Sequence, residues 1–184
     1  MVGHGFGGYE RELRSLLSGD PGSVRAYARS LPAVERSEFE RLIEEPYLVI
    51  RGAGSLGLDL VALRRELALP IEVKASSAAV IRFTAASGRA NEQLAAHRAA
   101  AARAGLMVVY AYRRLGLRGQ EVWRLFSAGN APHRGLLSIA CRALPQVEAT
   151  REGNGILRWE GGMPLSRFLG RVRFLSARPE PIGG

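Results

Sequence analysis

The segment that decides the fold is residues 69–74, which read LPIEVK. Its short β-favouring pattern predicts a strand, and alternate side chains of a strand point to opposite faces of the sheet. Glu72 and Lys74 therefore share one face, while Ile71 and Val73 face the core. We expect the two charged side chains to meet on one side of the sheet.

Lys74 is the only lysine of the chain, although Lys and Arg together number 26 among 184 residues. Arginine is a planar group that stays charged, whereas lysine is a compact point charge that can give up its proton. A chain that uses arginine at every other basic position has kept lysine beside Glu72. This indicates a catalytic role for Lys74, such as orienting or deprotonating a water molecule.

A second carboxylate, Asp59, lies in the apolar run Leu58–Leu63, which predicts the preceding strand. If the two strands pair, Asp59, Glu72 and Lys74 converge within a few ångströms. Two carboxylates at one point form a site for a hard cation of the Mg²⁺ type. We therefore expect Mg²⁺, with Mn²⁺ as a substitute, bound by Asp59 and Glu72. The alternative is a turn aspartate beside a solvated Glu–Lys pair on an edge strand.

The first helix is predicted over Tyr9–Leu17, where Glu10, Leu13 and Leu17 share a face. Glu12 lies about 200° around the helix from Glu10, at 3.6 residues per turn. Glu10 is therefore the acid expected on the core-facing side, and it is a candidate third metal ligand. Alternatively, both acids are solvated residues of the first turn, favoured there by the helix dipole.

The remaining patterns predict a single domain of the α/β class with a central mixed β-sheet flanked by helices. Three strands follow one another closely before a helix and a further strand, which is not a regular βαβ alternation. Further helices are expected at 23–30, 34–44, 90–104 and 164–169, and further strands at 47–51 (buried), 106–112, 121–127 and 155–159, with a loop or irregular strand at 75–88.

The composition favours an intracellular, DNA-associated protein. The net charge of +9 favours a polyanionic partner such as nucleic acid, because basic side chains release counterions from phosphates. A proteome rich in arginine is the alternative explanation. The single cysteine, Cys141, fits a reducing compartment. No apolar run reaches the ~18–20 residues of a membrane span, and the N-terminus lacks a signal-peptide pattern.

A dinucleotide-binding fold is a competing interpretation. Residues 52–57, GAGSLG, follow an apolar run, and Glu72 lies 20 residues after Gly52, near the position of a ribose-binding acid. This interpretation requires a helix over 55–67. The run Leu58–Leu63 is too uniformly apolar for an amphipathic helix, so we expect no nucleotide cofactor.

Several segments together resemble the archaeal-type Holliday junction resolvases of the PD-(D/E)xK nuclease superfamily. They are 8–13 (GYEREL), 49–61 (VIRGAGSLGLDLV) and 71–74 (IEVK), followed in the same order by 92–94 (EQL), the strand ending at Tyr112, 121–124 (EVWR), 155–159 (GILRW) and 164–169 (PLSRFL). The resemblance covers most of the chain.

The resemblance implies a restriction-endonuclease-like fold with one nuclease domain over 1–184. It implies a homodimer that binds a four-way DNA junction and makes paired Mg²⁺-dependent cuts. The catalytic residues would be Glu10, Ser55, Asp59, Glu72 and Lys74, with Glu10, Asp59 and Glu72 as metal ligands. Arg11 and Arg51 match positions near the scissile phosphate, and Arg82 is the basic residue expected to contact DNA after Lys74.

The chain departs from this family in one long segment, residues 20–45, which reads as a helical insertion. It could cap the cleft, redirect the DNA or decorate the surface. The family-like C-terminal segment is 155–170, and 178–184 is expected to be frayed. Two alternatives remain open: a repair or restriction-type nuclease acting on duplex DNA, and a catalytically silent DNA-binding module.

Overall fold

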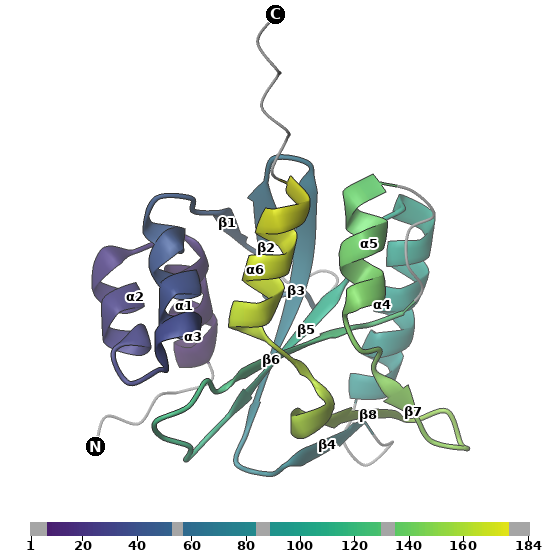
Figure 1. Cartoon of the computed structure of the whole chain (residues 1–184). Coiled ribbons are helices and arrows are strands. Elements are labelled where there is room, and N and C mark those ends of the chain that lie inside the picture. Colours follow the sequence, from purple (N-terminus) through teal and green to yellow (C-terminus); the bar gives the residue numbers. More distant parts are fainter. Residues whose placement is uncertain (1–6, 53–56, 84–88, 130–134, 177–184) are drawn as a thin grey trace, which may run out of the picture.

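The computed structural model describes residues 7–52, 57–83, 89–129 and 135–176 (Figure 1). Its centre is a six-stranded sheet in the spatial order β1 (Leu48–Arg51), β2 (Leu60–Arg64), β3 (Leu67–Ser76), β5 (Val109–Arg114), β6 (Trp123–Ser127) and β9 (Met163–Pro164). β3 and β5 are parallel, and the other neighbouring pairs are antiparallel. The predicted central mixed sheet is confirmed.

A second, three-stranded sheet has the order β4 (Val80–Phe83), β8 (Gly155–Arg158) and β7 (Glu148–Ala149). The helices are α1 (Gly7–Leu17), α2 (Pro21–Ala28), α3 (Ala33–Glu40), α4 (Ala90–Ala104), α5 (Gly135–Ala143) and α6 (Leu165–Ser176), with single 3₁₀ turns at Arg41–Ile43 and Trp159–Gly161. Among the described residues, no helix combines the length and apolarity needed to cross a membrane.

Local signals explain several element boundaries. Asp20 caps α2, because its side chain accepts a hydrogen bond from the Ser23 N–H at 2.8 Å, and Pro21 opens the helix. α4 ends at Gly105, whose φ of 66° lies in the left-handed region that glycine adopts without strain. The bounds of α4 agree with the predicted helix 90–104.

The two faces of the central sheet are packed differently. Helices α1, α2, α3, α5 and α6 share a large core with one face, and α6 lies in front of the sheet in Figure 1. A smaller core on the other face joins α4 and the second sheet to β5 and β6. Ile71 is buried in the large core and Val73 packs against it, so the alternation predicted for β3 directs Glu72 and Lys74 to the opposite face.

Residues 20–45 fold into the large core. Val24, Phe39 and Leu42 are buried there, and α3 packs on α6. An ion pair also joins the two helices, with 3.0 Å between Nη2 of Arg173 and Oε1 of Glu38. These residues are therefore integral to the packing and do not merely decorate the surface.

Some sequence-based expectations are wrong. β1 is an exposed edge strand, with Leu48 66% and Ile50 49% exposed, where a buried strand was expected. By contrast, the strand predicted over 58–63 is confirmed, because residues 60–64 form strand β2 and not the helix that a dinucleotide fold requires. The sequence patterns missed α5, and α6 extends well past the helix predicted at 164–169.

Candidate functional site

Asp59 is held against β3 by the pairing of β2 with that strand. Leu60 lies opposite Ile71 in the antiparallel register, so Asp59 immediately precedes this pair. The Asp59 N–H donates to the Ile71 carbonyl oxygen at 3.0 Å, and the Val73 N–H donates to Oδ2 of Asp59 at 2.7 Å. The carboxylate is therefore oriented by the backbone on either side of Glu72.

Glu72 and Lys74 form a close ion pair on the face of β3 that carries them. The Nζ of Lys74 donates to Oε1 of Glu72 at 2.6 Å. Glu72 is 3% exposed, while the side chain of Lys74 retains 24% of its exposure. A charge-assisted bond of this length is strong in a buried setting. The pair therefore has a buried acid and a base that reaches solvent.

Burial dominates the acidity of Glu72 and raises its pKa from 4.5 to about 7. The nearby ammonium of Lys74 and the amide of Gln93 lower the pKa, whereas the charge of Asp59 raises it further. Oε2 of Glu72 is buried without a hydrogen-bond partner in the described part of the chain, since the Gln93 amide is aligned on a backbone carbonyl instead. Of the two carboxylate oxygens of Glu72, only Oε1 therefore accepts a hydrogen bond from a described residue.

Asp59, Glu72 and Lys74 open into one cleft of about 580 Å³. The cleft is lined by Tyr9, Glu10, Asp59, Glu72, Val73, Lys74, Ala75, Ser76, Ile81 and Leu115. Residues from α1, the Asp59 segment, β3 and β4 thus meet here, along with Leu115 just after β5. The cleft is large enough to admit a segment of an extended ligand, and its wall contains both acidic and basic groups.

Glu10 reaches this cleft from α1. Its side chain is 22% exposed, and its Oε2 lies 3.5 Å from Nη2 of Arg51 at the end of β1. Among the residues described, no three His, Cys, Asp or Glu side chains form a group that could hold a metal ion. Glu10 therefore lies in the same cleft as Asp59 and Glu72 but does not form a three-carboxylate cluster with them.

Asp59 and Glu72 nevertheless fit a hard divalent cation. Both supply carboxylate oxygens, the ligand type that Mg²⁺ prefers, and waters usually complete its octahedron. The unpartnered Oε2 of Glu72 and the raised pKa of this carboxyl are what a cation would correct. Of the residues described, these two are the candidate ligands.

The predicted DNA-binding arginines are distributed around the site. Arg51 is exposed beside Glu10. Arg11 lies on another side of α1, where it lines a separate hollow and its Nε donates to the Gly7 carbonyl oxygen at 3.1 Å. Arg82 is exposed on β4, next to the cleft residue Ile81. Ser55 lies outside the described residues.

Sequence patterns missed the position of Gln93 in the first turns of α4. Its Nε2 donates to the Gly57 carbonyl oxygen at 2.8 Å, two residues before Asp59, and its amide also lowers the pKa of Glu72. Gly57 has a φ of 70°, and a Cβ there would lie 2.0 Å from Nε2 of Gln93. Gln93 thus anchors the segment that carries Asp59 to α4, close to Glu72.

Glu12 leaves α1 on the flank opposite Glu10 and is bonded to the sheet, so the alternative that both acids are merely solvated is wrong. Its Oε1 accepts hydrogen bonds from Nε of Arg113 and Nε1 of Trp123, both at 2.9 Å, and its Oε2 accepts one from Nη2 of Arg113 at 3.0 Å. The guanidinium of Arg113 also lies 4.7 Å from the ring centroid of Tyr9. Because α1 lies against the sheet, one flank carries Glu10 to the cleft and the other carries Glu12 to β5 and β6.

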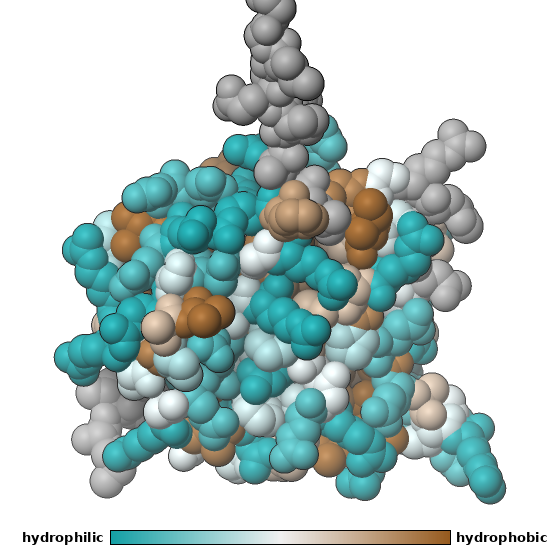
Figure 2. Space-filling model, in the orientation of Figure 1, coloured by the Kyte–Doolittle hydropathy of each residue, from teal (hydrophilic) through white to brown (hydrophobic). Residues whose placement is uncertain are grey.

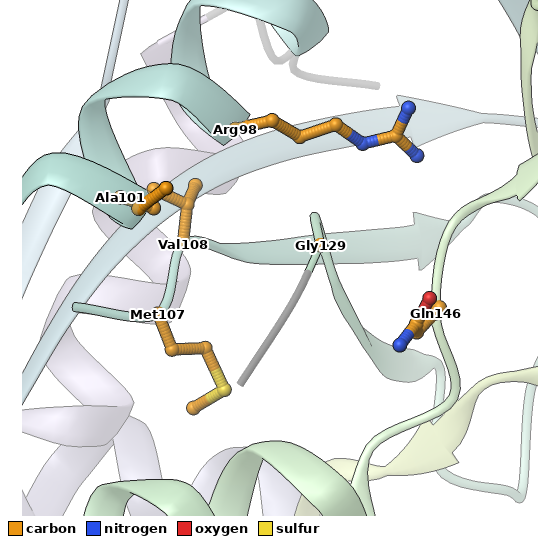
Figure 3. Close-up of a pocket in the computed structure, with 7 residues that line it drawn as sticks. Arg98, Ala101, Met107, Val108, Gly129 and Gln146 are labelled. Atoms are coloured by element: carbon orange, nitrogen blue, oxygen red, sulfur yellow. The ribbon is translucent and has the colours of Figure 1, made fainter. Parts of the chain in front are cut away.

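A second hollow, of about 260 Å³, lies beside α4 (Figure 3). Arg98 extends across it from α4, with Met107, Gly129 and Gln146 around its wall. The guanidinium donates to the carbonyl oxygens of Ala128 and Val147, so it joins α4 to the segment after β6. The guanidinium of Arg98 is thus used in structural hydrogen bonds, and none of the described residues that line the hollow is acidic.

Comparison with known proteins finds similarity only among solved structures. No protein-family model and no curated protein matches the chain. The solved structure of Archaeoglobus fulgidus Hjc, a Holliday junction resolvase from an archaeal hyperthermophile, is similar at 21% sequence identity and a TM-score of 0.44. The match covers 74% of this chain and 93% of that one. A likeness at this level carries no argument about activity.

Proposed function

We propose that this chain is a structure-specific DNA endonuclease that cuts four-way junctions with Mg²⁺, as a homodimer inside the cell. The observation that carries the proposal is the buried Glu72 carboxylate bonded at 2.6 Å to the only lysine of the chain, with Asp59 lining the same cleft. The resemblance of these segments to junction resolvases supports the choice of substrate. The net charge of +9 supports a nucleic acid.

In this proposal, the residues of the cleft have different roles in phosphodiester hydrolysis. A cation held by Asp59 and Glu72 would lower the pKa of a bound water and offset charge on the phosphate. Lys74 has three N–H donors and gives one to Glu72, which leaves donors for a phosphate oxygen or the attacking water. A guanidinium is larger and cannot release its proton, so arginine would serve poorly here.

The arginines around the cleft are the candidates for holding DNA. Arg51 at the mouth and Arg82 on β4 would contact phosphates, and each such contact adds affinity without selecting sequence. A two-fold symmetric junction requires two cuts in a fixed relation, which a homodimer supplies. The specificity for branched DNA would then come from the spacing of two clefts.

The test is cleavage of a synthetic four-way junction with and without Mg²⁺. We expect Asp59→Ala, Glu72→Ala and Lys74→Ala to abolish cutting while junction binding, measured in Ca²⁺, stays near wild type. Glu40→Ala, at an exposed acid on α3, is the matched control and should cut normally. Lys74→Arg keeps the charge, so near-normal cutting by this variant would refute the catalytic role of the lysine.

A panel of branched and linear substrates separates the alternatives. A junction, a fork and a duplex of the same length are compared for affinity and cutting. Equal affinity and cutting of duplex would favour a repair or restriction-type nuclease. Binding without Mg²⁺-dependent cutting of any substrate would favour a catalytically silent DNA-binding module.

A further inference from the structure

Arg114, at the end of β5, differs from the other half-buried arginines that the structure describes. Those others all donate hydrogen bonds to carboxylates or carbonyl oxygens of the chain, and they are Arg64, Arg98, Arg113, Arg124 and Arg173. The guanidinium of Arg114 makes no hydrogen bond or ion pair with a described residue, and its Nε is buried. A buried donor without an acceptor costs free energy, so this nitrogen requires an explanation.

Arg114 lies at one end of the candidate catalytic cleft. In the parallel register of β3 and β5, Ser76 is the residue opposite Arg114. Lys74, two residues earlier on β3 and therefore on the same face as Ser76, is opposite Tyr112. With ordinary strand spacings, the Cα atoms of Lys74 and Arg114 are about 8 Å apart. Ser76 lines the cleft, and so does Leu115, whose N–H donates to the Ser76 carbonyl oxygen at 2.9 Å.

The residues that precede Arg114 on β5 show which way its side chain points. Arg113 is turned to the other face of the sheet, where it is bonded to Glu12 of α1. Tyr112, on the same face as Arg114, is fully buried, and its hydroxyl donates to the Ala78 carbonyl oxygen. Burial raises the pKa of Tyr112 and the charge of Arg114 opposes that rise, so the guanidinium lies near this fixed ring. Arg114 thus faces the side of the sheet that carries the cleft.

Exposed arginines give no comparable signal, because water satisfies their donors. Figure 2 shows the face with α6 in front, where hydrophilic side chains predominate. Arg167 and Arg171 are exposed on this helix. In a chain with a net charge of +9, exposed basic side chains alone do not locate a binding site. A partly desolvated arginine at the cleft is more specific evidence, because the described chain leaves it without an acceptor.

We propose that Arg114 binds a phosphate of the DNA strand in the cleft, next to the phosphate that is cut. The inference rests on the proposed function, which places the scissile phosphate at Lys74. A guanidinium presents its N–H donors in a planar fork, so Nε and a terminal nitrogen fit two phosphate oxygens at once. The phosphate would give the buried Nε its missing acceptor and would offset the charge of Arg114. Because Lys74 and Arg114 lie on one face of the sheet, a single DNA strand can contact both.

The test is the affinity of the protein for a synthetic four-way junction in Ca²⁺, measured over a range of salt concentrations. Arg114→Gln should weaken binding roughly tenfold or more, because a charge-assisted contact is lost. It should also reduce the slope of log affinity against log salt by about 0.9, the value for one phosphate contact. Arg114→Lys keeps the charge and should restore most of the slope. Arg171→Gln, at an exposed position of α6, is the matched control and should bind as wild type does.

Junctions that carry one neutral methylphosphonate linkage identify the phosphate that Arg114 contacts. For wild type, a neutral linkage beside the cut site should weaken binding about as much as Arg114→Gln does. For Arg114→Gln, the same linkage should cost no further affinity, whereas other linkages should weaken both proteins equally. Because the buried Nε has no acceptor in the described chain, Arg114→Met should melt at a temperature no lower than wild type.

Three results would overturn the inference. In the first, Arg114→Gln binds the junction with the affinity and salt slope of wild type. In the second, every neutral linkage weakens wild type and Arg114→Gln equally. In the third, Arg114→Met melts well below wild type, which would show that the chain itself uses the guanidinium. Cutting is scored separately: a protein that cuts normally but gives one of these results keeps the proposed function without this contact, and a protein that shows the expected effects but never cuts keeps the contact without the nuclease activity.

Discussion

At Glu72 two effects oppose each other, and their balance defines the site. Burial of this carboxylate disfavours its charge, while the ammonium of Lys74 at 2.6 Å favours it. Burial wins, and the pKa reaches about 7. A fully satisfied structural ion pair would have placed both Glu72 oxygens on donors. Oε2 instead has no donor among the described residues, and the cation of the proposed function would supply the missing positive charge.

The first prediction concerns pH and the stability of the metal-free protein. The folded pKa of Glu72, about 7, exceeds its ordinary value of 4.5, so the folded state binds this proton more tightly than the unfolded chain. The protonated Glu72 therefore adds to the free energy of unfolding. This stabilisation, up to roughly 3 kcal/mol, is fully present below pH ~4.5 and is lost as pH rises through ~7. Urea unfolding of wild type and Glu72→Gln in EDTA, at pH 5 and pH 8, isolates this difference.

The expected outcome is that wild type loses more stability than Glu72→Gln between the two pH values. Mg²⁺ should reduce the loss, because a bound cation stabilises the ionised carboxylate. Parallel pH profiles for the two proteins in EDTA would show that Glu72 titrates normally.

The second prediction concerns Gln93. Gln93→Leu removes the amide that bonds to the Gly57 carbonyl oxygen and lowers the pKa of Glu72, so the segment that leads to Asp59 loses its anchor on α4 and the two candidate metal ligands are held less precisely. Loss of such a supporting group typically lowers metal affinity or activity roughly tenfold to a hundredfold. Mn²⁺ binding, measured by electron paramagnetic resonance without DNA, checks this directly. Glu92→Leu, an exposed neighbour on α4, should bind Mn²⁺ as wild type does.

At the scale of elements, a sequence predicts those features of helices and strands that depend only on residues close together in the chain. The bounds of α4 and the alternation along β3 were predictable because a terminal glycine and a two-residue period are local signals. The exposure of β1 was not predictable, because a short apolar run has the same sequence pattern in a central strand and in an edge strand. α5 was missed because its apolar residues follow a segment without a clear helix start.

The same limit applies to the candidate site. Glu72 and Lys74 lie on β3, and Asp59 immediately precedes the neighbouring strand β2, so the two-residue period and the short spacing between the strands suffice to predict that they meet. Gln93 lies 36 residues from Gly57, and Glu12 lies 101 residues from Arg113. These contacts depend on how α4 and α1 dock on the sheet, which periodicity alone does not specify.

The third prediction follows from the docking of α1. Glu12→Ala leaves the guanidinium of Arg113 and the indole N–H of Trp123 without their shared acceptor. Trp123 is fully buried, so an unmet donor there should destabilise the fold by about 1–3 kcal/mol. Urea unfolding measures the loss. Arg14→Ala, at an exposed position of α1, should change stability by less than about 0.5 kcal/mol.

At the scale of the whole molecule, the chain is organised in unequal layers. The large core joins five helices to one face of the sheet, and the other face is only partly covered. A single sequence shows that a sheet and helices exist, but not which end of the sheet lacks a cover. That arrangement leaves the cleft at Glu72 open and Leu48 and Ile50 of β1 exposed.

The final prediction concerns residues 20–45. Because Val24, Phe39 and Leu42 lie in the large core, removal of this segment should prevent folding and not merely alter DNA binding. The graded form of the test is Phe39→Ala, which truncates a side chain with no exposure and a ring 4.9 Å from that of Tyr27. We expect a loss of about 3–5 kcal/mol in urea unfolding.

Val34→Ala provides the comparison within the same helix. Val34 is 76% exposed on α3, so its truncation should change stability by less than about 0.5 kcal/mol. If the segment were a surface decoration, the two variants would be equally stable and a chain lacking residues 21–44 would remain folded by circular dichroism. A large difference in stability between the two variants would instead make α2 and α3 part of the folding unit, since α3 packs on α6, which lies in front of the sheet in Figure 1.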